Sequence, residues 1–533
     1  MKDKIWIIGL SIIFMILMIF SVFVIFLNKS SDDSIPTIPQ TAKAGDLIYK
    51  KKLTYSYGKN EYDAEYGILI VPENRSKLDS KLIGIPVVKI NAVNESSLAP
   101  IFILEGGPGN SNMQLQGPEE LLLSHDMVLV GYRGMDGSTN LRSKKLENAL
   151  RADDLLSEEG LSQIENITKE VIRDYQAQGI DLSGYTPFEV VHDLDAARRA
   201  LGYDKINLYS VSYGTRLAQY YDKYFSEHIQ YAALLGINPP GAFMWEPDVM
   251  DSVLEQYETL WKSETSHYKT DKSLIQMMDT AFDDAPDRWL FFNINKDKIR
   301  VASFFLLMET ETSPYVFDAY QAAANGDYSG FAALTLACDW LLPTASNWGD
   351  MLAKGVMDYD KSRNYRKIET DAHTIGSPVS KLLFGGFAQS WPKYPIAEEL
   401  KRVHPSSTRT LLINGNLDMS TPAVNAENDL IPHLSNATYI KLHHMGHTVT
   451  EAQPQAMERL LTSFYRTGIA DDSLFVEETF SFHSKFNFTT IVKTIVFVLF
   501  CIPIMIIIAI YFIIKKIRSK QNSIEQETLD SKT

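Results

Sequence analysis

Three residues far apart in the chain have the side chains that nucleophilic catalysis needs. Ser212 lies within Ser210-Val211-Ser212-Tyr213-Gly214, Asp418 follows an apolar run, and His447 ends His443-His444-Met445-Gly446-His447. A serine hydroxyl is a weak nucleophile until a base accepts its proton, and that base needs a carboxylate to hold its tautomer. We therefore interpret Ser212 as a nucleophile, His447 as its base and Asp418 as the acid that orients the base.

The residues around Ser212 have the pattern of a strand, a sharp turn and a helix. Residues 206–211 favour a strand, and the residues from Tyr213 onward favour a helix. The turn would raise the serine hydroxyl above the sheet, and the helix would direct its first N–H groups at a developing oxyanion. We expect the N–H of Tyr213 to donate there. Ser210 stands where such turns usually carry glycine; a plain turn is the alternative interpretation.

A second loop has the glycine content of an oxyanion-binding segment. The apolar run 100–104 predicts a strand buried on both faces, and it ends in Glu105-Gly106-Gly107-Pro108-Gly109-Asn110. A phosphate-binding loop would continue with Gly-Lys-Ser or Gly-Lys-Thr, which does not follow here. Because glycine lets the backbone approach a substrate carbonyl closely, we expect this loop to supply a second oxyanion N–H. A simple turn is the alternative.

The three histidines near residue 447 could also indicate a metal site. They lack helical spacing and partner ligands, so we predict neither a metal nor a cofactor. His443 and His444 fall at the end of a predicted strand. His447 falls on the loop beyond it, where it can reach Ser212.

The order of elements predicts a doubly wound, mostly parallel sheet. Thr186-Pro187-Phe188-Glu189 has the pattern of a capping box and predicts a helix that ends near Gly202. Residues 237–405 have helical patterns and contain six of the seven tryptophans, which predicts an inserted helical cap. The predicted strands are 66–72, 83–90, 100–104, 127–134, 206–211, 231–236, 410–414 and 438–442, and a helix over 451–466 closes the domain.

Composition excludes some classes of function. The chain has 533 residues, which suggests about two domains, and a formal net charge of −15, which argues against a nucleic-acid partner. Its two cysteines cannot form a disulfide framework.

Two apolar segments predict membrane spans. Residues 5–27 and 494–514 are each long enough to cross a bilayer as a helix. Lysines precede the first segment and a basic cluster follows the second, so both termini are predicted to be cytoplasmic and the body extracellular. Cleavage of the first segment as a signal peptide is the alternative.

The predicted organisation has nine parts. They are a cytoplasmic N-terminus (1–4), a transmembrane helix (5–27), a linker (28–48), the first part of the core (49–236), the cap (237–405), the second part of the core (406–470), a juxtamembrane spacer (471–493), a transmembrane helix (494–514) and a cytoplasmic tail (515–533).

These motifs together resemble the proline iminopeptidase and tripeptidyl aminopeptidase family of α/β-hydrolases over about residues 60–467. The resemblance rests on the glycine loop, the Arg133-Gly134 turn, the helix ending at Gly202, the segment Asp418-Met419-Ser420-Thr421-Pro422 and Gly446-His447. It implies the α/β-hydrolase fold and the triad of Ser212, Asp418 and His447. It also implies that the N–H groups of Gly107 and Tyr213 form the oxyanion hole. Glu105, Ser210 and Leu235 depart from the family pattern.

The resemblance further implies a serine exopeptidase that acts on peptide substrates at a free N-terminus. An α-amino group is cationic near neutral pH and needs a carboxylate partner inside a closed site. Glu246 and Asp339 of the predicted cap are the candidates for that partner, and Trp391 is a candidate for lining the pocket. Two alternatives are an esterase or lipase with the same triad, and a catalytically inactive surface receptor.

Overall fold

A mixed sheet of nine strands lies at the centre of the computed structural model, in the order β1-β2-β3-β5-β4-β6-β7-β10-β11. The structure describes residues 37–94, 98–263, 273–368, 375–393, 398–484, 486–500 and 508–515. The strands are β1 (Leu47–Tyr57), β2 (Asn60–Pro72), β3 (Leu82–Ile90), β4 (Ile101–Leu104), β5 (Met127–Val130), β6 (Ile206–Val211), β7 (Ile229–Leu235), β10 (Thr410–Gly415) and β11 (Ala437–Leu442).

The pairing of these strands confirms a mostly parallel sheet. From β5 to β11 every neighbouring pair is parallel, whereas β1, β2 and β3 pair antiparallel with their neighbours. All residues of β4 and β5 are buried, as the apolar runs predicted. β1 was not predicted as a strand, because it lies at the edge of the sheet and most of its side chains are exposed or half-buried.

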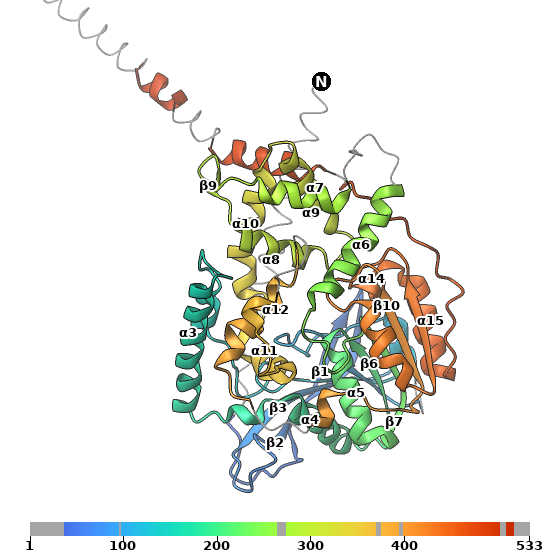
Figure 1. Cartoon of the computed structure of the whole chain (residues 1–533). Helices are drawn as coiled ribbons and strands as arrows, with labels where there is room; N and C mark the ends of the chain where they lie inside the picture. The colour runs from blue at the N-terminus through green and yellow to red at the C-terminus, as the bar shows by residue number, and fades with distance from the viewer. Residues whose placement is uncertain are drawn as a thin grey trace, which may run out of the picture. The chain divides into compact units, whose positions relative to one another are not determined.

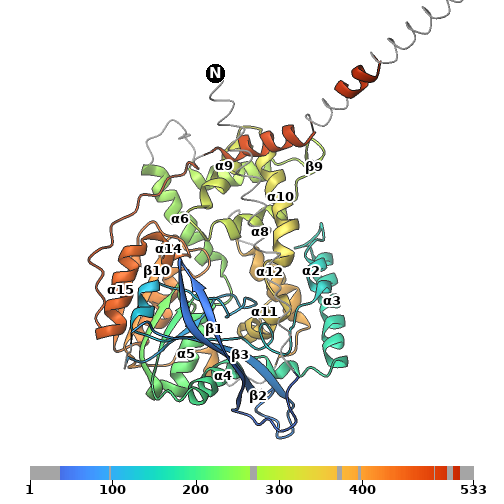
Figure 2. The same cartoon turned by 180° about the vertical axis from the view of Figure 1, so that it is seen from behind.

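Helices cover the sheet and form a cap at one end of it (Figure 1, Figure 2). Beside the sheet lie α4 (Pro187–Ala200), α5 (Tyr213–Phe225), α13 (Ala423–Asn425), α14 (Val449–Ala452) and α15 (Pro454–Thr467). The helices α2 (Lys144–Ala149) and α3 (Glu158–Ala177) pack against the cap instead. The cap between β7 and β10 contains α6 (Pro247–Ser263), α7 (Leu274–Asp283), α8 (Lys296–Leu306), α9 (Ser313–Ala324), α10 (Ser329–Leu341), α11 (Trp348–Gly355), α12 (Pro378–Gly385) and the short strands β8 (Arg288–Trp289) and β9 (Phe292–Asn293).

The predicted helix after Thr186 forms, but the predicted capping box does not. α4 begins at Pro187 with Thr186 as its N-cap, and the threonine side chain makes no capping hydrogen bond. The Glu189 carboxylate instead accepts hydrogen bonds from the backbone N–H and the guanidinium of Arg75, each through a different oxygen. The capping-box prediction is therefore wrong, because the Glu189 carboxylate binds Arg75, which is distant in sequence, instead of the start of its own helix.

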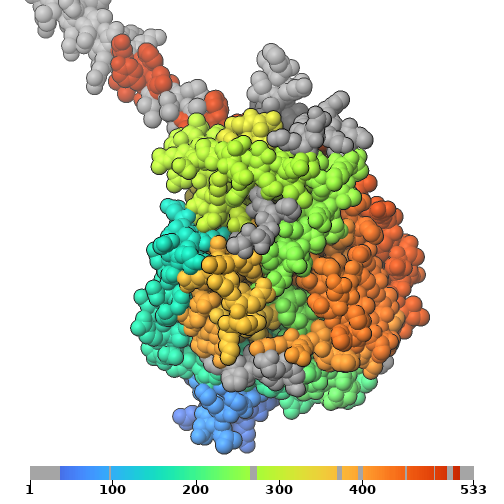
Figure 3. Space-filling view, viewed as in Figure 1, coloured from blue at the N-terminus to red at the C-terminus, as the bar shows by residue number. Residues whose placement is uncertain are grey.

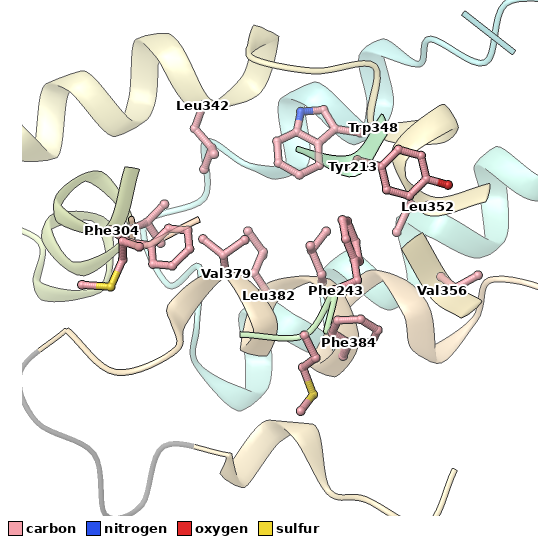
Figure 4. Packing of buried hydrophobic residues seen from close by; sticks show 14 of the residues in the cluster. Tyr213, Phe243, Phe304, Leu342, Trp348, Leu352, Val356, Val379, Leu382 and Phe384 are labelled. Atoms are coloured by element: carbon pink, nitrogen blue, oxygen red, sulfur yellow. The ribbon is translucent and has the colours of Figure 1, made fainter. Parts of the chain in front are cut away.

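One hydrophobic core joins the cap to the helix that follows Ser212. Figure 4 shows Tyr213 and Phe243 among cap residues that include Leu352, Val356 and Phe384. The rings of Tyr213 and Phe243 lie 6.1 Å apart, edge to face. In the space-filling view the blue N-terminal part of the core forms the lower end of the face that is shown (Figure 3). The cap is therefore packed as part of the fold rather than attached to it.

Neither predicted membrane span is described in full. Residues 5–27 lie outside the described part of the chain, as do residues 501–507 of the second segment. Residues 488–500 form a helix whose first turn contacts the cap, where the N–H of Phe488 donates to Asp318 at 3.0 Å. Among the described helices, none has the length and apolar composition needed to cross a bilayer.

A buried arginine ties the sheet to α4. Arg133, fully buried after β5, donates through Nε and Nη2 to the two carboxylate oxygens of Asp193 at 2.6 and 2.7 Å. Its remaining N–H groups donate to the backbone carbonyls of Pro72, Glu73 and Gly184. Burial acts to raise the pKa of Asp193, but the charges of Arg133 and Arg75 outweigh it and lower that pKa.

We expect Asp193→Ala to lower the free energy of unfolding by about 3–5 kcal/mol, because it removes the carboxylate that pairs with Arg75 and Arg133 and leaves the buried Arg133 charge with Glu189 alone, at 3.3 Å. Urea denaturation of the full chain in detergent would measure this change. Arg142→Ala is the control: its side chain is 56% exposed in the pair with Glu147, so the loss should be below about 1 kcal/mol. Equal losses of unfolding free energy in the two variants would contradict a structural role for the buried Asp193 carboxylate.

Candidate active site

Ser212 occupies a strained turn between β6 and α5. Its backbone has φ +54° and ψ −125°, which a non-glycine residue rarely adopts. Its N–H donates to the Leu235 carbonyl at 2.8 Å, and its own carbonyl accepts from the N–H and the hydroxyl of Thr215 at 2.9 and 2.6 Å. These bonds hold the turn that raises the half-buried Ser212 side chain above the sheet.

Close packing around this turn explains why small residues stand on either side of it, at positions 210 and 214. A Cβ atom on Gly214 would lie 2.0 Å from the Leu104 carbonyl oxygen, so helix and strand can approach only with glycine there. Ser210 is fully buried, and its hydroxyl donates to the Ala233 carbonyl at 2.8 Å. The departure from glycine at position 210 is therefore accommodated by a satisfied hydrogen bond.

Asp418 and His447 meet where the last two strands end. Asp418 follows β10 and His447 follows β11, and His447 Nδ1 lies 2.9 Å from Asp418 Oδ2. The fully buried carboxylate also accepts from the N–H groups of Ser420 and Thr421 at 2.7 and 2.9 Å, and from the Thr421 hydroxyl at 2.5 Å. Burial alone would raise the pKa of Asp418, but His447 and these donors lower it, so the acid stays ionised.

The pKa of His447 is raised above its usual value of 6.5. Burial acts to lower it, and the negative charge of Asp418, with smaller contributions from Glu309 and Glu105, outweighs burial. The His447 side chain keeps 17% of its surface exposed, so it is reachable from solvent. An imidazole oriented by a buried carboxylate is suited to accept a proton and return it.

Gly236 lies between the serine turn and the histidine loop. It follows Leu235, whose carbonyl accepts the Ser212 N–H. A Cβ atom on Gly236 would lie 3.1 Å from both His447 Cε1 and Thr421 Oγ1. The structure thus brings the serine turn, the acid loop and the histidine loop to one edge of the sheet.

The predicted oxyanion donors lie at the same edge. Tyr213 begins α5, and the first N–H groups of a helix have no intrahelical acceptor. The glycine loop crosses directly over the nucleophile, since a Cβ on Gly106 would lie 2.7 Å from Ser212 Cβ. Gly107 follows with φ +117°, a conformation that favours glycine. Its N–H as an oxyanion donor stays a prediction.

The structure gives the three predicted substrate-binding residues other partners. Both oxygens of Glu246 pair with Arg363, at 2.5 and 2.8 Å. Asp339 pairs with the buried Lys298 at 2.6 Å. Trp391 is only 1% exposed and packs against Tyr175 of α3. Their roles in binding substrate stay predictions, and each side chain would have to leave or share the partner it has here.

Two residues at the site were missed from sequence. Thr421 bonds the acid and lies 3.1 Å from His447 Nδ1, and its position three residues after Asp418 could have indicated it. Glu309 of the cap accepts from the N–H of Thr448 at 2.9 Å and from its hydroxyl at 2.5 Å. No local signal indicates Glu309, because 139 residues separate it from Thr448. In the described part of the chain, no group of three or more His, Cys, Asp or Glu side chains could hold a metal ion.

Two parts of the chain match known protein families. Residues 99–267 match the family described as the alpha/beta hydrolase fold, and residues 386–474 match the family described as TAP-like protein. Serine protease Hip1 of Mycobacterium tuberculosis is 29% identical over 189 residues, 33% of this chain and 36% of the relative. Tripeptidyl aminopeptidase of Streptomyces lividans is 23% identical over 240 residues, 42% of this chain and 44% of the relative.

The chain thus matches less than half the length of these curated relatives. Among solved structures, proline iminopeptidase of Mycobacterium smegmatis aligns with a TM-score of 0.36 at 12% identity, over 75% of this chain and 98% of that one. The order of the strands, the serine turn and the two family matches agree: the chain has the α/β hydrolase fold, and residues 386–474 are similar to TAP-like proteins.

Proposed function

We propose that this protein is a serine hydrolase of the peptidase type, which forms an acyl-enzyme on Ser212. The observation that carries the proposal is the buried Asp418 carboxylate 2.9 Å from His447, beside the strained serine turn. His447 accepts the Ser212 hydroxyl proton as the oxygen attacks the carbonyl carbon, and the N–H groups of Tyr213 and Gly107 stabilise the oxyanion. His447 then protonates the leaving amine, and water releases the acyl group by the same steps.

Peptides are the substrate class that the relatives favour. One relative is named a serine protease and another a tripeptidyl aminopeptidase. We propose that the substrate is a peptide with a free N-terminus, cleaved near that end.

Glu309 is our candidate for binding the substrate amine. It lies on the cap segment that packs over the histidine loop, where the N–H of His447 donates to the Met308 carbonyl at 2.7 Å. Burial raises the pKa of Glu309 and the hydrogen bonds from Thr448 act against it, and its charge acts on His447. A carboxylate this close to the base is placed to accept an ammonium group beside the reacting carbonyl.

The proposed location is the cell membrane. The two apolar segments support an anchored protein with both termini in the cytoplasm and the catalytic domain outside. Extraction of the full chain from membranes with alkaline carbonate would contradict this location.

Ser212→Ala should abolish labelling by a fluorophosphonate, because the reagent needs the activated hydroxyl. His447→Ala should lower the labelling rate by about 10²–10⁴-fold, the usual contribution of a positioned base. Ser210→Gly is the matched control and should still label, since Ser210 bonds only within the sheet in our assignment. An unlabelled wild-type protein would favour the inactive receptor instead.

Peptides with free N-termini should be cleaved, and the same peptides with acetylated N-termini should not. Glu309→Gln should lower kcat/KM for free peptides by about 10–100-fold, the value of one hydrogen bond to a charged group. Mass spectrometry of a peptide library measures both effects. A short ester without an amine is the control for effects of the substitution that act through Thr448 or through the pKa of His447. At a pH well above that pKa, hydrolysis of the ester should not change. Cleavage of esters alone would support the esterase, and equal cleavage of blocked peptides would exclude an exopeptidase.

The acid limb of the pH profile should have its midpoint above 6.5, because His447 must be neutral to act as base and its pKa is raised. Activity is lost as pH falls through that pKa. Asp418→Asn should move the midpoint down, since the main charge that raises the pKa is gone, and should lower kcat by up to about 10⁴-fold. The pH dependence of kcat/KM measures both; an unmoved midpoint would show that another group controls it.

A further inference from the structure

The glycine loop is held from two different sides. At its base, the fully buried Asn112 side chain donates to the carbonyls of Ile103 and Val130, and it accepts the N–H of Glu105 at 2.8 Å. These partners belong to the sheet and to the residue directly after β4. The base of the loop is therefore fixed by the α/β core.

The tip of the loop is held by the cap. The Ser346 hydroxyl donates to the Pro108 carbonyl at 3.0 Å, and the N–H of Asn347 donates to the Gly109 carbonyl at 2.9 Å. The N–H of Gly109 in turn donates to Asp350 Oδ2 at 3.1 Å. Residues 346–350 at the start of α11 thus clamp the tip over the nucleophile.

Asp350 has its orientation fixed by a buried ion pair. Its other oxygen, Oδ1, accepts from Lys354 one helical turn later, and neither side chain has any exposed surface. Lys354 also donates to the Arg133 carbonyl at 3.1 Å. A Cβ atom on Gly134 would lie 2.5 Å from Asp350 Oδ1, so the turn after β5 must carry a small residue to admit the carboxylate.

A buried ion pair of this kind is weak evidence for stability, because desolvation of the two charges offsets much of their attraction. Its effect here is geometric. With Oδ1 bound by Lys354, Oδ2 points at the Gly109 N–H. Gly107 lies between that anchor and Gly106, the residue packed on Ser212.

We propose that Asp350 is a positioning residue of the oxyanion hole, through which the cap sets the place of the Gly107 N–H. The inference rests on the proposed function, since it assigns Gly107 to the oxyanion. Asp350 touches no substrate in this scheme; it acts through the hydrogen bond to Gly109.

Two double variants of the full chain separate this role from a structural one. Asp350→Leu with Lys354→Met replaces the ion pair by apolar side chains of similar size and removes the acceptor for Gly109. Asp350→Asn with Lys354→Met removes the same charges but keeps a carbonyl oxygen that can accept from Gly109. Both variants remove Asp350 and Lys354 together, so neither keeps one charge of this pair without the other. Both also remove the Lys354 charge that acts on Asp136, so the effect on Asp136 is the same in the two, and thermal unfolding would check that both fold.

The measurements are kcat and KM for a hydrolysed substrate, and inhibition by a peptide boronic acid and by a cleavage product. The boronate forms a tetrahedral adduct that uses the oxyanion hole, whereas the product does not. In the Leu/Met variant kcat should fall about 10²-fold, because a misplaced oxyanion donor costs about that much in rate. Its affinity for the boronate should fall by the same factor. Its KM and product inhibition should be unchanged, and the Asn/Met variant should recover most of the loss.

Equal activity of the two variants would overturn the inference, and so would equal weakening of boronate and product. Failure of the proposed function looks different: the wild-type chain would neither react with a fluorophosphonate nor turn over any substrate. If the wild-type chain hydrolyses esters only, the same comparison is made with an ester, because the oxyanion forms there too.

Discussion

The candidate site depends on a carboxylate that has been removed from water. Asp418 is fully buried, and its two oxygens accept four hydrogen bonds, from two backbone N–H groups, one hydroxyl and the His447 ring. A buried anion is tolerated only when it is paired and hydrogen-bonded, so the loop after β10 and the loop after β11 must fit together. The serine turn is joined to these loops through Gly236. That glycine packs closely against Thr421 and His447, and the residue before it, Leu235, accepts the N–H of Ser212.

The cap takes part in the geometry of the site. Tyr213, whose N–H is an expected oxyanion donor, has its ring inside the core of the cap, where it packs on Phe243. The Met308 carbonyl accepts the N–H of His447, and Asp350 accepts the N–H of Gly109. The histidine loop, the glycine loop and the serine turn therefore all contact the cap, and movement of the cap would disturb all three.

Features set by neighbouring residues were predictable. The strand and helix around Ser212, the buried strand before Glu105 and the helix from Pro187 all form as expected, because hydrophobic period and turn residues act over a few positions. The hydrogen-bond and ion-pair partners of charged side chains were not predictable in the same way. Glu189 was expected to cap its own helix and instead binds Arg75, and nothing near Glu246 in the sequence indicated its ion pair with Arg363, 117 residues away.

By itself the sequence determined the order of the sheet strands after β1, the insertion of a cap and the three residues that could form a triad. Their spacing placed each of them just after a strand, and parallel strands end at one edge of a sheet. Only the tertiary structure decided which carboxylates are neutralised, that Glu309 and Thr421 lie beside His447, and that the cap holds the glycine loop through Asp350. Those pairings join segments far apart in the chain, and their hydrogen bonds exist only after the sheet and the cap have packed.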